Sequence, residues 1–215
     1  MTTKPTGRRG RPVDEPSRQR RRQEILACAA RVFARNGYPG TDMQAVADAA
    51  KVAKGTLYLY FEGKEGLFLA AVDQGMTSLR AAVDAAVEGL TDPLEVIEQA
   101  IFAYLRFFKE HPEQVELLIL ERAEFRDRKR STYFSHREAG KDRWHDLLRG
   151  LRDAGRVRDV PLERIDDVVS DLVYGTMFTN HFSGRHKPLD AQARDILDIV
   201  YHGILSEQER RGRTP

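Results

Sequence analysis

The chain has 215 residues, of which 41% are hydrophobic and 32% are charged, with one cysteine and a formal net charge of +2. This length is sufficient for one or two domains with a sizeable core. No apolar run approaches the roughly 18 residues of a membrane span, and the N-terminus lacks the apolar core of a signal peptide. We therefore expect a cytoplasmic protein with no membrane partner. The lone Cys28 excludes a disulfide within the chain, and we interpret it as a small packing residue.

The small net charge conceals an asymmetry along the chain. Residues 1–60 carry 12 Lys and Arg against 5 Asp and Glu, whereas residues 61–215 carry 23 against 28. A basic N-terminal part joined to an acidic remainder is typical of a protein that presents one end to a polyanion.

Residues 1–16 are expected to form a flexible basic arm, because they are rich in Pro, Gly, Thr and Arg and nearly free of apolar side chains. Within them, the tetrapeptide Arg9-Gly10-Arg11-Pro12 resembles the core of an AT-hook, in which arginines lie along a narrow DNA minor groove. We hypothesise that Arg9 and Arg11 bind in this way. The alternative is a tail that only keeps the protein soluble.

A first helix is predicted over residues 17–36, with an apolar stripe at Ile25, Ala29, Val32 and Phe33 and a C-cap at Gly37. Its first turns carry a cluster of arginines at positions 18, 20, 21 and 22. Cations are unfavourable near the positive N-terminal end of a helix. The cluster therefore suggests DNA phosphate as a partner, with a solvated charge cluster as the alternative.

Residues 41–61 are predicted to form two short helices joined by a turn at 51–53. Thr41 followed by Gln44 has the spacing of a capping box, which predicts a helix start just after Thr41. The apolar face of this helix comprises Met43, Val46, Ala47 and Ala50. The second helix is expected over 54–60, with Leu57 facing inward and Lys54, Thr56 and Tyr58 outward. Two such helices are typical of the helix-turn-helix unit, whose second helix enters the DNA major groove.

Over residues 22–72 the sequence resembles the DNA-binding domain of the TetR family of transcriptional regulators. The matching positions are Phe33, Gly37, Thr41, Val46-Ala47, the run Gly55-Thr56-Leu57-Tyr58-Leu59-Tyr60-Phe61, Lys64-Glu65 and Leu67. One departure is Ala53, where family members often carry Ser or Thr at the start of the recognition helix. Because Ala is a poor N-cap, we expect this helix end to be held less firmly.

The resemblance implies contacts with double-stranded operator DNA. Besides Arg9 and Arg11, the candidate DNA-binding residues are Thr41, Gln44, Lys54, Gly55, Thr56, Tyr58, Tyr60 and Lys64. Thr56 and Tyr58 are expected at base edges, and Thr41, Tyr60 and Lys64 at phosphates. Gly55 would let the backbone approach the duplex closely.

The remaining chain predicts six further helices and no strand, which makes the protein all-α with about nine helices. They are expected near residues 64–88, 93–109, 112–126, 131–154, 161–183 and 190–210, with Asp92 and Asp190 as N-caps. Gly75 is a candidate bend, and the charged run Glu121–Arg130 is interpreted as an exposed connection. The predicted organisation is a basic arm (1–16), a helix-turn-helix domain (17–72) and a helical bundle for effector binding and dimerisation (73–210).

The family resemblance also implies a homodimer formed through the last two helices and an unknown small-molecule effector. Candidates for the effector pocket, each weighed against ordinary core packing, are Phe102, Tyr104, Leu105, Trp144, Tyr174, Phe178 and His181. The predicted function is a transcriptional regulator, specifically a repressor that binds a palindromic operator as a dimer and is released by its effector. The alternatives are an activator, or an architectural DNA-binding protein that acts without a ligand.

An enzyme is the less favoured class. The sequence has no nucleotide-binding Gly-rich loop, no His-Glu-x-x-His and no Gly-x-Ser-x-Gly motif. His181 and His186 are five residues apart and are expected to straddle a helix end rather than bind a metal. We therefore expect no catalytic residue, no metal site and no cofactor.

Overall fold

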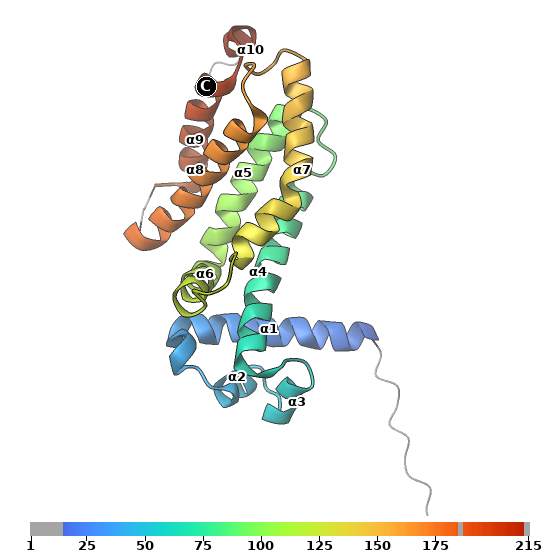
Figure 1. Cartoon of the computed structure of the whole chain (residues 1–215), viewed down its shortest axis with the longest axis vertical. Coiled ribbons are helices and arrows are strands. Elements are labelled where there is room, and N and C mark those ends of the chain that lie inside the picture. The colour runs from blue at the N-terminus through green and yellow to red at the C-terminus, as the bar shows by residue number, and fades with distance from the viewer. Residues whose placement is uncertain (1–14, 185–186, 213–215) are drawn as a thin grey trace, which may run out of the picture.

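The computed structural model describes residues 15–184 and 187–212, which fold into ten helices (Figure 1). In chain order these are α1 (Glu15–Gly40), α2 (Met43–Ala49), α3 (Lys54–Tyr58), α4 (Gly63–Val87), α5 (Pro93–Glu110), α6 (Pro112–Glu124), α7 (Thr132–Asp153), α8 (Leu162–Ser183), α9 (Leu189–Ile204) and α10 (Glu207–Gly212). Within these ranges the only β-type pairing is an isolated bridge between Val157 and Leu205. The all-α prediction is confirmed. None of the ten helices is both long and apolar enough to cross a bilayer.

The helices build an elongated molecule with the two shortest N-terminal helices at one end (Figure 1). There α1 lies across the long axis, and α2 and α3 lie below it. The long helix α4 rises from this end and packs along α5 and α7, so that it belongs to both halves of the molecule. The upper bundle is completed by α8 and α9, and α10 lies at the opposite end from α3.

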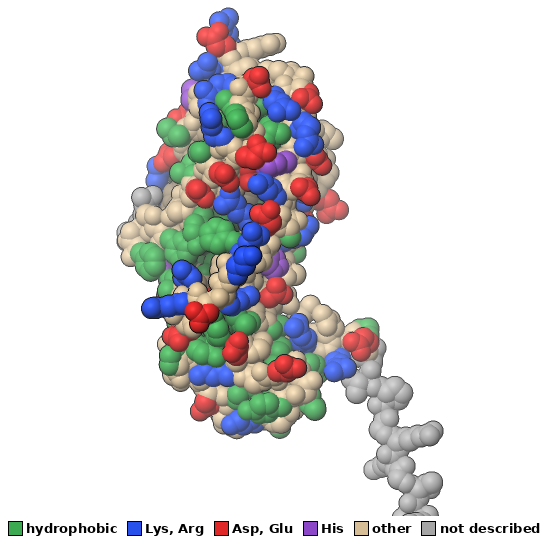
Figure 2. Space-filling view, in the orientation of Figure 1, with side chains coloured by type: hydrophobic (Ala, Val, Ile, Leu, Met, Phe, Trp, Pro, Cys, Tyr) green, Lys and Arg blue, Asp and Glu red, His purple; other side chains and the backbone are tan. Residues whose placement is uncertain are grey.

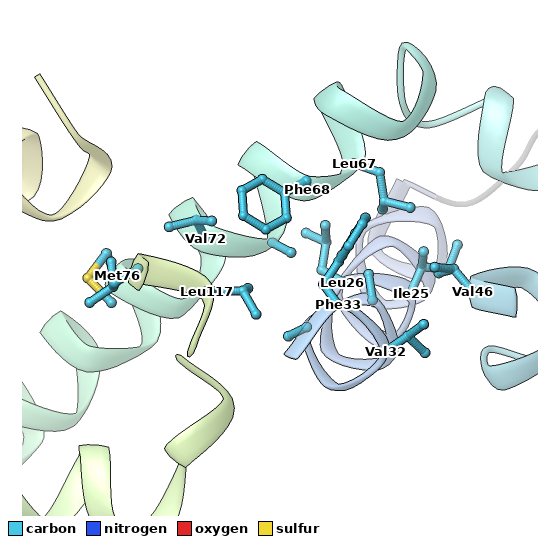
Figure 3. Packing of buried hydrophobic residues seen from close by; sticks show 14 of the residues in the cluster. Ile25, Leu26, Val32, Phe33, Val46, Leu67, Phe68, Val72, Met76 and Leu117 are labelled. Atoms are coloured by element: carbon cyan, nitrogen blue, oxygen red, sulfur yellow. The ribbon is translucent and has the colours of Figure 1, made fainter. Parts of the chain in front are cut away.

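The buried side chains form two clusters that do not follow the predicted domain boundary. The first begins in α1–α3 and continues through α4 into α5 and α6, where it includes Phe107 and Leu117. Figure 3 shows Leu117 of α6 in the space between α4 and α1, close to the labelled side chains of Phe33 and Val72. The second cluster holds α5, α7, α8 and α9 together in the upper bundle.

Gly75 of α4 marks a close helix contact. The glycine is buried, and a Cβ atom built on it would lie 1.9 Å from Oε1 of Gln114 on α6. No side chain larger than hydrogen fits there without moving Gln114. The sequence drew attention to Gly75 as a bend, and the structure instead gives it a packing role between α4 and α6.

Several helix ends differ from the predictions. α1 begins at Glu15, inside the predicted arm. Its helical backbone is interrupted at Gly37, the residue predicted to stop the first helix, whose φ of 73° is unfavourable for residues other than glycine. Asp92 caps α5 as predicted, accepting a hydrogen bond from the Leu94 N–H. Asp190 is not a cap, because α9 already begins at Leu189. The predicted last helix is divided because Leu205 is extended and pairs with Val157.

The charged run Glu121–Arg130 is not wholly exposed, contrary to the prediction. Its first residue, Glu121, lies in the last turns of α6 and is only 1% exposed. The carboxylate accepts hydrogen bonds from the backbone N–H (3.0 Å) and hydroxyl (2.7 Å) of Thr132 at the start of α7, and it pairs with Arg128. These donors satisfy the buried carboxylate, and they hold the end of α6 against the start of α7.

Candidate DNA interface and ligand cavity

The α2–turn–α3 unit has the predicted arrangement. Val46 and Ala47 of α2 and Leu57 of α3 are fully buried, and α2 packs against both α3 and α1. The turn between them contains Lys51 in the left-handed region, with a φ of 54°. As expected from Ala53, the N-terminus of α3 has no side-chain cap.

The capping box predicted at Thr41 is wrong by one residue. Asp42 is the N-cap of α2 and accepts a hydrogen bond from the Ala45 N–H at 2.8 Å, which lowers the pKa of its carboxyl group. Thr41 is only 2% exposed, and its hydroxyl donates to the Gly37 carbonyl at 2.7 Å. Gln44 is exposed and donates to Asp48. Because the Thr41 hydroxyl is buried and already bonded, we do not retain Thr41 among the DNA contacts.

The outward face of α3 and the residue that follows the helix are exposed. Tyr58 is 55% exposed, and the adjacent Leu59 is 74% exposed. Lys54 and Gly55 are also exposed, and Thr56 is half-buried. A Cβ atom placed on Gly55 would meet no atom within 4 Å, so the backbone there faces open space. Large side chains left exposed on a short helix indicate a contact surface.

Basic side chains of α1 contact the aromatic residues that follow α3. The guanidinium carbon of Arg18 is 5.8 Å from the ring centre of Tyr60, and that of Arg22 is 5.4 Å from the ring centre of Phe61. The arginine cluster predicted for the first helix is therefore brought to the end of the molecule that carries α3. Tyr60 itself is half-buried.

Lys64 has a local role that the sequence did not predict. Its Nζ donates to the Pro39 carbonyl at 3.1 Å and lies 4.6 Å from the ring centre of Tyr38. The lysine thus ties the start of α4 to the end of α1. Arg9 and Arg11, the candidates in the arm, lie outside the described residues.

A cavity of about 240 Å³ lies between α4, α5, α7, α8 and α9. Two of the seven predicted pocket residues, Tyr104 and Trp144, line it. The apolar lining also includes side chains that the sequence did not single out, at Met76, Leu79, Val83, Ile97, Ile101, Leu147, Ile165, Val173, Val200 and Ile204. Periodicity alone could not distinguish these positions from ordinary core. Lining residues come from both buried clusters, so the cavity lies where the two cores meet.

The other five predicted pocket residues lie elsewhere. Leu105 is buried in the second cluster, and Phe102 packs against that cluster. Tyr174 and Phe178 pack on the first cluster and contact each other's rings. His181 forms a 2.6 Å contact from its Nε2 to Glu116. Its suggested neighbour, His186, lies outside the described residues.

Two tyrosines of the cavity wall pair through their hydroxyl groups. The hydroxyl oxygens of Tyr104 and Tyr133 are 3.0 Å apart. Burial raises the pKa of Tyr133 to about 12 and raises that of Tyr104 well above its ordinary value. Both phenols therefore stay protonated to a higher pH than an exposed tyrosine, and one of the two hydroxyls donates to the other.

The outer face of α8 and α9 exposes large apolar side chains. Val168 and Phe182 of α8 are 60% and 70% exposed, and Ile199 of α9 is 69% exposed. Figure 2 shows a green patch around the lower end of α8. Apolar surface of this kind is typical of an interface between proteins.

Comparison with known proteins places these features in a family. Residues 25–71 match the profile of the bacterial regulatory proteins of the tetR family. The repressor KstR2 of Mycobacterium tuberculosis is 27% identical over 191 residues, covering 87% of this chain and 94% of KstR2. The activator FasR of Mycolicibacterium smegmatis is 35% identical over 104 residues, or 48% of this chain. The chain spans about half the length of the first curated relatives that it matches, 47% in the case of FasR.

Solved structures share the fold over nearly the whole chain. The ketosteroid regulator KstR2 superposes with a TM-score of 0.63 at 25% identity, covering 87% of this chain and 96% of the other. FadR of Bacillus subtilis, in complex with stearoyl-CoA, superposes with a TM-score of 0.68 at 18% identity, covering 82% and 96%. The helix-turn-helix match, the relative that aligns over most of its length and the common fold agree: residues 25–71 of this chain belong to the tetR family of bacterial regulatory proteins.

Proposed function

We propose that the protein is a transcriptional repressor that binds a palindromic operator as a homodimer and is released by a small molecule with a large apolar body. The observation that carries the proposal is the exposed face of α3, where Tyr58 projects from the helix and is followed by the exposed C-cap residue Leu59, while the buried Leu57 anchors the opposite side. A helix held in this way can enter the major groove with Lys54, Thr56 and Tyr58 facing base edges and phosphates.

A dimer is supported by the exposed apolar side chains of α8 and α9. Burying Val168, Phe182 and Ile199 against a second copy would remove them from water, and a two-fold interface uses the same patch on both subunits. Such a dimer presents two α3 helices, so that each reads one half-site of a palindrome.

Effector release is supported by the position of the cavity. Its wall includes Met76, Leu79 and Val83 of α4, the helix that continues directly from the helix-turn-helix unit. A ligand that prefers one position of α4 would shift the separation of the two α3 helices. An apolar effector fits the lining, and the relatives' descriptions, a ketosteroid regulator and a stearoyl-CoA complex, name molecules with large apolar parts.

The direct test is a footprint of the purified protein on DNA upstream of its own coding region, at low and at physiological salt. The proposal expects a protected palindrome that persists at physiological salt, with half-sites about one helical turn apart or slightly more. Diffuse protection that disappears with salt would favour the architectural alternative, since non-specific binding rests on phosphate contacts.

We favour a repressor over an activator because of the relatives' names and the lengths over which they align. KstR2, named as a repressor, aligns over 94% of its length, whereas the activator FasR aligns over about half. Reporter expression from the footprinted promoter, with and without the regulator, separates the two. Lower expression with the regulator present would support the repressor.

A further inference from the structure

A basic cleft lies directly beside the apolar cavity. This cleft of about 540 Å³ is formed by the end of α6, the connection to α7, and the facing sides of α7 and α8. Its lining is dominated by cations and comprises Arg122, Arg128, Lys129, Arg130, Ser131, Phe134, Arg137, Glu138, Lys141, Asp166 and Asp167. Figure 2 shows Lys and Arg side chains gathered at mid-height, where α6 ends and α7 begins.

Some of these cations are neutralised within the protein. Arg137 is held by Asp167 at 2.9 Å and lies 3.8 Å from Asp166. Arg128 pairs with the buried Glu121. The contact of Arg130 with Glu138 is long, at 3.9 Å, and both side chains are exposed, so it contributes little.

Three cations of the cleft remain without an acidic partner among the described residues, namely Arg122, Lys129 and Lys141. The cleft also lies at the N-terminal end of α7, a helix of 22 residues, where the helix dipole adds positive potential. An anion with more than one charge is the natural complement of such an excess.

The cleft and the cavity adjoin each other and share part of their lining. Arg137, Lys141 and Asp166 line both of them. By contrast, Arg143 of α7, which also lines the cavity, is paired with Asp84 of α4. A ligand that enters the cavity with its apolar part can therefore place a charged end in the cleft past Lys141.

We propose that cavity and cleft form one composite site for an amphipathic ligand, with an apolar chain in the cavity and a phosphate-bearing head in the cleft. This inference rests on the proposed function in taking the cavity as the effector site. A phosphate monoester carries a charge of about −1.5 to −2 and three acceptor oxygens, which suits several separated cations, whereas a carboxylate carries about one charge and two oxygens. Arg122, Lys129 and Lys141 bind the head, and Tyr104 and Trp144 contact the chain.

The test uses three probes with the same ten-carbon chain, decyl phosphate, decanoate and decanol, below the concentrations at which they form micelles. Trp144 is the only tryptophan of the chain and lines the cavity, so its fluorescence reports binding in the full-length protein. Decyl phosphate should bind about tenfold or more tightly than decanol, the change expected from one or two charge-assisted hydrogen bonds. Decanoate should lie between the two.

The triple variant Arg122→Gln/Lys129→Gln/Lys141→Gln removes the unpaired cations. It should lose most of the preference for decyl phosphate, while its affinity for decanol stays as in the wild type. The matched control is Arg106→Gln/Lys109→Gln/Arg164→Gln, which removes the same charge from exposed positions outside the cleft. The control should retain the preference, because long-range attraction is screened by salt.

Equal affinity for decyl phosphate and decanol would overturn the composite site, and so would equal losses in the triple variant and its control. If decanoate bound as tightly as decyl phosphate, the proposed preference of the cleft for a phosphate head would be refuted. Operator release is measured separately with the footprinted DNA. Head-selective binding without release would leave the composite site standing and refute the effector role of the cavity.

Discussion

Glu121 of α6 and Thr132 of α7 are joined through both the backbone and the side chain of the threonine, whose N–H and hydroxyl each donate to the same carboxylate. The carboxylate is also paired with Arg128. This junction fixes the connection from α6, which packs on α1, to α7, which lines the cavity. It is thus a physical link between the half of the molecule that contains the cavity and the end that carries the helix-turn-helix unit.

Replacing Glu121 should destabilise the fold. Glu121→Ala leaves the buried N–H and hydroxyl of Thr132 without their acceptor, at a cost of about 2–3 kcal/mol in the free energy of unfolding. Urea denaturation measures this difference. Glu138→Ala is the control, because that carboxylate is exposed and its contact with Arg130 is long, so the change should be within about 0.5 kcal/mol. Equal effects of the two substitutions would contradict the structural role of Glu121.

Adding one methyl group at Gly75 should also destabilise the protein. In an open helix position Gly→Ala stabilises by about 0.5–1 kcal/mol. At Gly75 the new Cβ would collide with the amide end of Gln114, and because that side chain is itself buried it must move within packed surroundings, an overpacking that costs about 1–3 kcal/mol. Gly140→Ala on α7, where a Cβ meets nothing within 4 Å, is the matched control and should stabilise.

A second substitution tests whether Gln114 is the cause. Gln114→Ala in the Gly75→Ala background should recover part of the lost stability, and a double-mutant cycle gives the coupling between the two positions. Additive effects would show that the strain at Gly75 arises from another neighbour.

Two variants of α3 should distinguish the side chain that reads bases from the side chain that binds phosphate. Tyr58→Ala should weaken operator binding by about 1–3 kcal/mol and relax sequence preference, whereas Lys54→Ala should weaken all sequences alike and reduce the salt dependence. Titration of operator and random DNA measures both. Because both side chains are exposed, the unfolding midpoint should stay unchanged in each variant. Equal losses on the two DNAs for Tyr58→Ala would refute its assignment.

The buried tyrosine pair predicts a loss of stability at high pH. The pKa of Tyr133 is raised from 10.0 to about 12 in the folded state, so above pH 10 the unfolded chain releases a proton that the folded chain retains. The stabilisation is complete below pH 10 and is lost as the pH rises toward 12, by up to about 1.4 kcal/mol per pH unit for this residue.

Urea denaturation from pH 8 to pH 11 measures that slope. Tyr133→Phe should make it shallower, although the variant starts from a lower stability because the hydrogen bond to Tyr104 is gone. Phe134→Leu, which alters a neighbouring ring without removing a hydroxyl, should retain the full slope. An unchanged slope in Tyr133→Phe would contradict the assignment.

A charge on α9 should dissociate the proposed dimer. Ile199→Glu places a carboxylate in the exposed apolar face, and burying it unpaired against a second copy is costly. Analytical ultracentrifugation should show monomers, and operator affinity should fall with dimerisation. Ala85→Glu adds the same charge at an exposed position on α4 and should leave the dimer intact. A dimeric Ile199→Glu protein would place the interface elsewhere.

The sequence predicted the helices and the DNA-binding unit better than the cavity. Helical periodicity and turn residues are local signals, which is why the turn at 51–53, the burial of Leu57 and the cap at Asp92 were all found. Glu121 was missed because a charged run usually indicates solvent, and no local pattern shows that Thr132 and Arg128 supply its donors. The cavity depends on five helices at once, so Val200 could not be told from ordinary core.

The two buried clusters divide the protein at a different place from the family's domain boundary. Because the helix-turn-helix unit shares its interior with α4 and α6, a fragment ending at residue 72 would expose the apolar surface that Leu117 and Phe107 normally cover. The lower part of the bundle should therefore unfold together with the DNA-binding end as one cooperative unit, and the upper bundle as another. Tyr104 packs on both clusters and lines the cavity between them. A ligand bound in that cavity would therefore couple the unfolding of the two units.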